Sequence, residues 1–166
     1  MHSHILPKTM PNWTQKFGYG KFIHLEPNAD GSANMMQGGQ FFRRIVENCW
    51  DEQLRIEEYK PFHTQVQVVC TIPVMFSYWA KTADALELSR FLNDHIAELV
   101  TRYPKNYIGL ATIPMQDPEV AILELERAKS IGHVGIQIGS NINDENLSEE
   151  KFFPIFEACE RLGMAV

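Results

Sequence analysis

Apolar residues in the larger, C-terminal part of the chain alternate between continuous runs and stripes at helical spacing. The continuous runs are residues 64–74, 106–115, 134–139 and the final segment 164–166. Residues 82–102 and 117–130 carry apolar side chains every three to four positions, which predicts amphipathic helices. Strands without polar alternation, each followed by one helix, predict an α/β fold with a parallel sheet covered on both faces.

Local sequence signals indicate where these helices begin and end. Residues 117–119 (Asp-Pro-Glu) supply an N-cap, a first-turn proline and an acid near the positive end of the helix dipole. Two acids likewise open a shorter predicted helix over residues 51–59. A further helical segment is predicted to begin at a Ser148 cap and to end at Gly163, because glycine favours the left-handed conformation at a helix C-terminus.

The region of about residues 14–48 has a different pattern. Its short strand-like segments are residues 21–27, 32–37 and 40–47. They are separated by Asn28-Ala29-Asp30-Gly31 and by Gly38-Gly39, which are turn sequences. We therefore expect a small antiparallel β insertion after the first strand, followed by βα units over residues 51–166.

The first strand carries the motif His2-Ser3-His4. Because strand side chains alternate, the two imidazoles face the same side and form half of a zinc site. A metal pair at the carboxyl end of a first strand favours a (β/α)8 TIM barrel, although an open doubly wound sheet also fits the pattern. The alternative for His2 and His4 is a flexible terminus without a site. Cys70, inside an apolar run, is interpreted as a core residue.

Composition excludes some classes of protein. The 166 residues, 45% of them hydrophobic, suffice for one domain with a core. A net charge of −6 does not indicate a nucleic-acid partner, and no apolar stretch reaches the ~18 residues of a membrane span. Three cysteines without a C-x-x-C motif are typical of reduced thiols in a cytoplasmic protein.

Several longer motifs are more specific. They are HSHILP (2–7), ENCWD (47–51), PVMFSYWAK (73–81), PMQ (114–116) and GIQIG (135–139). Together they resemble the 2-amino-3-carboxymuconate-6-semialdehyde decarboxylases, a family of the metal-dependent amidohydrolase superfamily. The resemblance implies a TIM barrel. Because a complete barrel needs about 250 residues, residues 1–166 are expected to form its N-terminal half, truncated at strand five.

The resemblance also implies an activity: zinc-dependent, oxygen-independent decarboxylation of 2-amino-3-carboxymuconate-6-semialdehyde to 2-aminomuconate semialdehyde, in tryptophan breakdown through the kynurenine route. In that family the H-x-H pair, here His2 and His4, binds one zinc ion, and an arginine matching Arg43 holds a carboxylate of the small dicarboxylate substrate. The family works as a homodimer. Its remaining zinc ligands and its catalytic histidine belong to motifs that this chain lacks, so no catalytic residue is expected here and the chain alone is expected to be inactive.

Other residues have two readings that the sequence leaves open. Met75 and Trp79 follow the strand of residues 64–74, and Phe42 precedes Arg43; these side chains either line a pocket for a flat conjugated acid or pack in the interior. Gln137 also has two readings, a polar group of the pocket or a hydrogen bond to the backbone, and the second is the one we expect. The remaining histidines, interpreted as structural, are His24, His63, His95 and His133. Two alternative functions also remain: a metal-dependent hydrolase of the same superfamily, or a non-catalytic truncated product.

Overall fold

The computed structural model describes all residues, 1–166, and divides the chain into two compact units. The first unit joins Met1–His4 to Val66–Val166, and the second unit is Ile5–Gln65. The first strand is therefore separated along the chain from the rest of its own sheet by the whole second unit.

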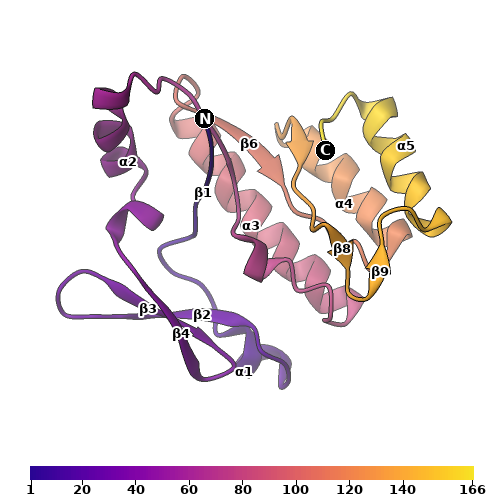
Figure 1. Ribbon diagram of the computed structural model, residues 1–166, viewed down its shortest axis with the longest axis horizontal. Coiled ribbons are helices and arrows are strands. Elements are labelled where there is room, and N and C mark those ends of the chain that lie inside the picture. The colour runs from indigo at the N-terminus through magenta and orange to yellow at the C-terminus, as the bar shows by residue number, and fades with distance from the viewer. The chain divides into compact units, whose positions relative to one another are not determined.

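The first unit contains a four-stranded parallel sheet in the order β1-β5-β6-β7, of which β1 and β6 are labelled in Figure 1. Its strands are β1 (His2–His4), β5 (Gln67–Cys70), β6 (Tyr107–Ala111) and β7 (Gly135–Ile136). The apolar runs thus form neighbouring parallel strands, as predicted, although β7 is shorter than its run. Ala165 makes a parallel bridge to Gly135, so the final segment continues the sheet next to β7.

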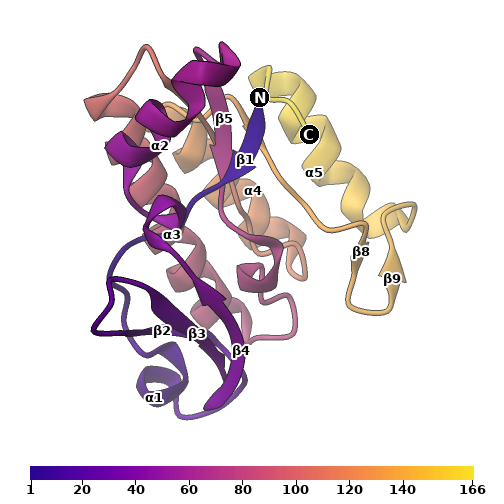
Figure 2. The same ribbon diagram turned by 60° about the vertical axis from the view of Figure 1, so that its left-hand side comes forward.

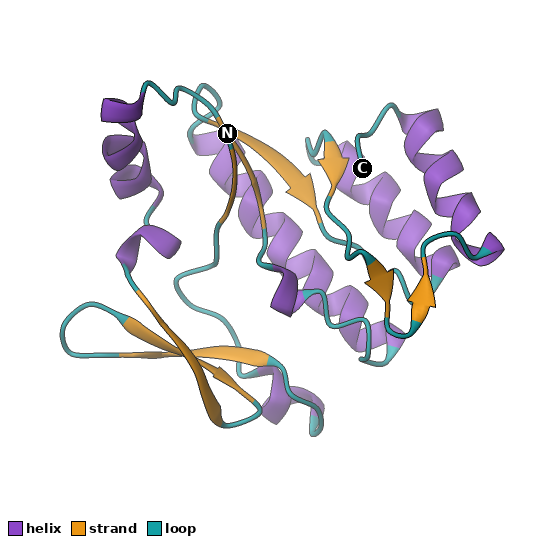
Figure 3. Ribbon diagram, in the orientation of Figure 1, coloured by secondary structure: helices purple, strands orange, loops and turns teal.

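Three long helices alternate with the strands of this unit (Figure 3): α3 (Thr82–Arg102), α4 (Pro118–Ser130) and α5 (Phe153–Leu162). The predicted signals act as expected. The Asp117 side chain accepts a hydrogen bond from the Val120 amide, and Gly163 adopts the left-handed conformation with φ 61°. Leu99 of α3, Leu125 of α4 and Ile155 of α5 are fully buried, which places the apolar stripe of each helix in the core.

The segment between β7 and α5 differs from the prediction. Residues 141–146 form a short antiparallel hairpin, β8 (Asn141–Ile142) and β9 (Glu145–Asn146), which the sequence pattern did not indicate. Asn143 makes its turn possible with φ 52°, a conformation that asparagine tolerates better than most residues. The predicted Ser148 cap is wrong by one position, because Glu149 precedes the short 3-10 turn (Glu150–Phe152) that leads into α5.

The second unit contains the predicted antiparallel insertion, with strand order β2-β3-β4 (Figure 2). Its elements are α1 (Trp13–Phe17), β2 (Ile23–Pro27), β3 (Ala33–Gln37), β4 (Gln40–Ile45) and α2 (Glu52–Tyr59). Gly38 and Gly39 both have positive φ in the β3–β4 turn, as the turn sequence requires. Helix α2 begins after Asp51, whose carboxylate accepts from the Leu54 amide at 2.7 Å.

A buried polar network joins α3 and α4 to Thr112, the residue that follows β6. The Asn93 side chain bonds both to the Thr112 amide at 2.8 Å and to the Thr112 carbonyl at 2.9 Å. Its amide nitrogen also donates to the fully buried Glu124 carboxylate at 2.8 Å. The same carboxylate accepts from the guanidinium groups of Arg90 and Arg127, so its charge is compensated inside the fold.

The free energy of unfolding is expected to depend on pH because of His133. The ring is buried just before β7, its Nε2 lies 3.1 Å from the Asn93 carbonyl, and burial lowers its pKa below the ordinary value of 6.5. Between the lowered folded pKa and 6.5 the unfolded chain binds more protons, so the free energy of unfolding should fall as pH decreases from 6.5. Urea titrations at pH 7.5 and 5.5 should show a smaller drop for His133→Gln than for the unchanged chain.

The exposed His63 provides the control for this experiment. His63 has a left-handed backbone with φ 56°, a conformation that asparagine tolerates. The free energy of unfolding of His63→Asn should therefore keep the full pH dependence of the unchanged chain. Equal pH dependence in His133→Gln and the unchanged chain would contradict the assignment to His133.

Candidate metal centre

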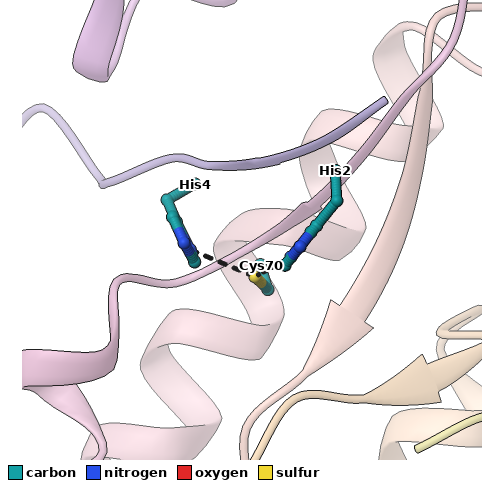
Figure 4. Close-up of side chains that lie close together, drawn as sticks. All are labelled: His2, His4 and Cys70. Atoms are coloured by element: carbon teal, nitrogen blue, oxygen red, sulfur yellow. Dashed lines mark hydrogen bonds between the residues drawn. The ribbon is translucent and has the colours of Figure 1, made fainter.

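His2 and His4 face the same side of β1, as the alternation of a strand requires (Figure 4). Their ring centroids are 5.2 Å apart with an interplanar angle of 65°. The strand is held in place from its first residue, because the Met1 amino group donates to the Val66 carbonyl at 2.9 Å and the Val68 amide donates to the Met1 carbonyl at 2.7 Å. The histidine pair therefore lies on an ordered strand, and the flexible-terminus alternative does not hold in this structure.

Cys70 is the third side chain of the site. It is the last residue of β5 and the register partner of His4 in the adjacent parallel strand. Its Sγ lies 3.1 Å from His2 Nε2 and 3.3 Å from His4 Nδ1 (Figure 4). The interpretation of Cys70 as a core residue is thus incomplete: the residue is buried, but its sulfur faces the two imidazoles.

Two polar groups support these three side chains. The Thr71 carbonyl lies 2.9 Å from His4 Nδ1. Donation of an Nδ1–H to this carbonyl leaves Nε2 of His4 with the lone pair that a cation needs, a common arrangement for metal-binding histidines. Gln137, which directly follows β7, accepts a hydrogen bond from the Cys70 thiol through Oε1. The side chain of Gln137 therefore contacts the site, which agrees with the reading as a polar pocket group and not with the expected hydrogen bond to the backbone.

The donor set suits a divalent transition metal. One ligand atom from each of His2, His4 and Cys70 lies within 4.8 Å of the other two. Two imidazole nitrogens and one sulfur are ligands that zinc binds tetrahedrally. Burial raises the pKa of the Cys70 thiol to about 12, so the thiol is neutral at pH 7.

The site lies at the carboxyl ends of the parallel strands. His4 ends β1, Cys70 ends β5 and Gln137 follows the last residue of β7. This edge is where (β/α)8 enzymes place their active sites, because the loops after each strand converge there. The geometry therefore brings His2, His4 and Cys70 together at the carboxyl edge of a parallel sheet, as a candidate metal site.

The segment after β5 holds two predicted pocket residues. Met75 is only 2% exposed, and its sulfur accepts a hydrogen bond from the Thr71 hydroxyl at 3.7 Å, so it packs in the interior. Trp79 is 46% exposed. The neighbouring Tyr78 anchors this segment, because its hydroxyl accepts from the Gly139 amide at 3.1 Å and its carbonyl accepts from the Asn143 side chain at 3.1 Å. Only Trp79 of the pair presents a surface to solvent.

Arg43 and Phe42 belong to the second unit, on β4, and both are exposed. The neighbouring Arg44 differs, because its guanidinium pairs with the Asp30 carboxylate and donates to the Ser32 hydroxyl at 2.9 Å. The pKa of Asp30 lies below its ordinary value, mainly because its carboxylate accepts hydrogen bonds from Ser32 and to a smaller extent because of the charge of Arg44. Arg44 thus stabilises the β2–β3 turn.

A family model described as amidohydrolase matches residues 1–166. The chain belongs to the amidohydrolase family. Its structure corresponds to part of the family's TIM barrel with an antiparallel insertion, which confirms the predicted fold class. No helix of the structure is both long enough and apolar enough to cross a membrane.

Relatives in this family are decarboxylases. The chain is 51% identical over 167 aligned residues to a 2-amino-3-carboxymuconate-6-semialdehyde decarboxylase of Dictyostelium discoideum, an alignment that covers 100% of this chain and 46% of the relative. The chain spans about half the length of the curated relatives of this kind that it matches. Family membership is thereby established for the whole chain, and the comparison concerns only half of each relative.

Solved structures agree with this relationship. A 5-carboxyvanillate decarboxylase from Novosphingobium aromaticivorans, crystallised with manganese and a nitrobenzoic acid, superposes with a TM-score of 0.67 at 29% identity over 72% of this chain and 34% of that chain. A crystal structure of an amidohydrolase II superposes with a TM-score of 0.68 at 17% identity over 96% of this chain and 46% of that chain, which supports the fold alone. A divalent metal is thus found in a related decarboxylase.

Proposed function

We propose that this chain forms the metal-binding N-terminal half of a decarboxylase that converts 2-amino-3-carboxymuconate-6-semialdehyde to 2-aminomuconate semialdehyde without oxygen. The observation that carries the proposal is the 51% identity to a relative of that activity along the entire chain. The ordered pair of His2 and His4 at the carboxyl edge of the sheet supports it, because this is the place where such an enzyme needs its metal.

The proposed ion is zinc. His2 and His4 supply two nitrogen ligands, and the Thr71 carbonyl orients the ring of His4. Imidazole donors suit zinc better than the harder ions that prefer oxygen. When bound, a divalent ion supplies Lewis acidity, which stabilises the negative charge that develops when a carboxylate leaves as CO₂.

The proposed substrate is a small dicarboxylate, and the residues proposed to hold it are Arg43, Phe42, Trp79 and Met75. Arg43 supplies a permanently charged fork that matches a carboxylate bidentately. Phe42 and Trp79 supply exposed aromatic surface for the flat conjugated chain of the substrate. Met75, which was predicted to line the same pocket, would act from the interior by supporting the segment that carries Trp79.

The proposal also covers the pathway, the cellular compartment and the oligomeric state. We propose that the reaction belongs to tryptophan catabolism through the kynurenine route, as the family resemblance implies. All three cysteines are free, which suits the cytoplasm. We further propose that the working enzyme is a homodimer. The 166 residues by themselves are expected to be inactive, because the chain contributes half of the residues of its relatives.

The decisive experiment joins residues 1–166 to the C-terminal half of the Dictyostelium relative. With zinc and the semialdehyde substrate under anaerobic conditions, the chimaera should consume the substrate's visible absorbance and release one CO₂ per molecule, whereas residues 1–166 alone should not. Loss of absorbance that depends on O₂, or hydrolysis of lactones and amides without CO₂ release, would contradict the proposal. The second outcome would favour the hydrolase alternative.

Arg43 gives this assay a matched pair of variants. Arg43→Ala in the chimaera should raise KM by about 10- to 100-fold, because a charge-assisted hydrogen bond to a carboxylate contributes about 1.5–3 kcal/mol. Arg44→Ala should leave KM nearly unchanged, since Arg44 pairs with Asp30 and Ser32 at the surface. Equal kinetics for the two variants would remove Arg43 from the substrate site.

A further inference from the structure

Trp79 is the exposed aromatic side chain of the segment that follows β5, and side chains of two other loops bond to the backbone on either side of it. We propose that Gln116 and Asn143 are positioning residues that hold Trp79 at the carboxyl edge of the sheet as a preformed surface on which the flat substrate stacks. This inference rests on the proposed function, and it concerns how the substrate site is made rigid before the substrate binds.

The two peptide carbonyls that flank Trp79 both accept hydrogen bonds from side-chain amides. Asn143 Nδ2 donates to the Tyr78 carbonyl at 3.1 Å, and Gln116 Nε2 donates to the Ala80 carbonyl at 3.1 Å. Gln116 lies between β6 and α4, and Asn143 lies in the β8–β9 turn, so the donors come from the loops that follow the next two strands of the sheet. The backbone of Trp79 is therefore attached on both sides.

The Tyr78 side chain provides a third attachment. Its ring is 8% exposed and stacks on Phe76 with centroids 5.5 Å apart, and its hydroxyl accepts from the Gly139 amide at 3.1 Å. Glycine permits this approach, because a Cβ at position 139 would lie 3.2 Å from Tyr78 Cε2. Since Ala80 is buried as well, the segment presents the half-exposed Trp79 between two buried neighbours.

The backbone of this segment forms a turn that serine does not favour by itself. The Ala80 amide donates to the Ser77 carbonyl at 2.9 Å, which places Tyr78 and Trp79 at the two central positions of the turn. Ser77 has φ 52°, a left-handed conformation that is unfavourable for residues with a side chain. Contacts from outside the segment therefore stabilise the turn, and the two amides supply such contacts.

Packing alone does not account for a glutamine at position 116. Its Oε1 is buried without a hydrogen-bond partner, which is unfavourable for an amide oxygen. A methionine of similar length would fill the same space without this penalty. The contribution of Gln116 is thus the hydrogen bond from Nε2 to the Ala80 carbonyl.

A rigid indole favours binding of a flat conjugated acid. A side chain whose backbone is already held loses less conformational freedom when the ligand binds. Stacking on Trp79 would act on the substrate before and during the reaction alike, so weaker positioning should raise KM and leave kcat nearly unchanged.

Fluorescence of the 166-residue chain tests the positioning without turnover. Trp13 and Trp50 are only 2% and 7% exposed, so acrylamide quenches mainly the emission of Trp79, and Trp79→Phe provides the blank. Gln116→Met and Asn143→Asp each keep the approximate shape of the side chain and remove the donor. In both variants the nanosecond local component of the Trp79 anisotropy decay should roughly double in amplitude.

Thr101→Ala is the control for these variants. It removes a hydrogen bond of the same kind, from Thr101 Oγ1 to the Ala97 carbonyl at 2.9 Å, near the C-terminus of α3. The anisotropy decay of Trp79 should be the same as in the unchanged chain. Unchanged local motion of Trp79 in both Gln116→Met and Asn143→Asp would overturn the proposal.

Kinetics of the chimaera provide the second test. Gln116→Met should raise KM roughly 3- to 10-fold and change kcat by less than about twofold. If Gln116 acts through Trp79, adding Gln116→Met to Trp79→Ala should leave KM at the value of Trp79→Ala alone. Additive effects of the two substitutions on KM would show that Gln116 only stabilises the fold, and would overturn its role in positioning.

The two proposals fail separately. If the chimaera does not decarboxylate the semialdehyde, the proposed function is wrong, and calorimetric affinities for trans,trans-muconate, a flat dicarboxylate, replace KM in the same cycle. Non-additive loss of muconate affinity would then support the positioning role, and absence of muconate binding would overturn it. If the chimaera decarboxylates and the effects on KM are additive, Gln116 is not a positioning residue and the proposed function stands.

Discussion

Replacing His4 with alanine is expected to lower the zinc affinity of this chain by at least about 100-fold. Loss of a residue that merely supports a ligand costs about 10- to 100-fold in metal affinity, so loss of a ligand itself should reach or exceed that range. His4 also connects two parts of the site, since its Nδ1 contacts both the Thr71 carbonyl at 2.9 Å and Cys70 Sγ at 3.3 Å. Chelator competition with purified protein measures the change.

The control for His4→Ala is a histidine outside the site. His24 lies on β2 in the second unit, 3.4 Å from the Glu26 carboxylate, and His24→Gln should leave zinc affinity and stoichiometry unchanged. In the chimaera, His4→Ala should also remove decarboxylation, with the circular dichroism of the folded protein retained. Full zinc affinity in a folded His4→Ala protein would show that the ion binds elsewhere.

Replacing Glu124 with alanine is expected to destabilise the fold by about 3 kcal/mol, because removal of one member of a buried ion pair leaves its partners uncompensated. The Glu124 carboxylate is fully buried and accepts from Asn93, Arg90 and Arg127, residues of both α3 and α4. Both arginines are partly exposed, so water reduces the penalty below that of a fully buried pair. Urea unfolding at pH 7 measures the difference.

Glu126 is the matched control, on the same helix two residues further. It pairs with Arg161 at 3.0 Å, and both side chains are exposed, by 43% and 59%. Glu126→Ala should therefore change the free energy of unfolding by less than about 1 kcal/mol. Similar losses for the two variants would show that burial of Glu124 does not decide its contribution.

Elements whose signals are local were predictable from the sequence. Helix α4 begins at Asp117 and Pro118 and α5 ends at Gly163, because capping and turn preferences depend on a few neighbouring residues. The boundaries Thr82–Arg102 of α3 follow equally from its apolar spacing. The antiparallel insertion was predictable as well, because its turn at Gly38-Gly39 has a strong sequence signature.

Elements without such signals were missed. Helix α1 has only five residues, too few for a periodic stripe, and it is held by an Asn12 cap and the buried Trp13. The β8–β9 hairpin has strands of two residues each, and its turn depends on Asn143 adopting a left-handed conformation. Asn143 is in turn held by a hydrogen bond to the Tyr78 carbonyl, 65 positions away, which no local pattern contains.

The candidate metal site also contains residues that the sequence predicted and residues that it did not. The sequence by itself determined that His2 and His4 share one face, because alternation along a strand is a property of neighbouring residues. Only the tertiary structure decided that Cys70 and Gln137 join them. Cys70 lies 68 positions after His2, Gln137 lies a further 67 positions on, and both reach the site through the register of separate parallel strands. That register results from packing of helices and strands across the whole unit, and apolar runs of similar composition do not specify it.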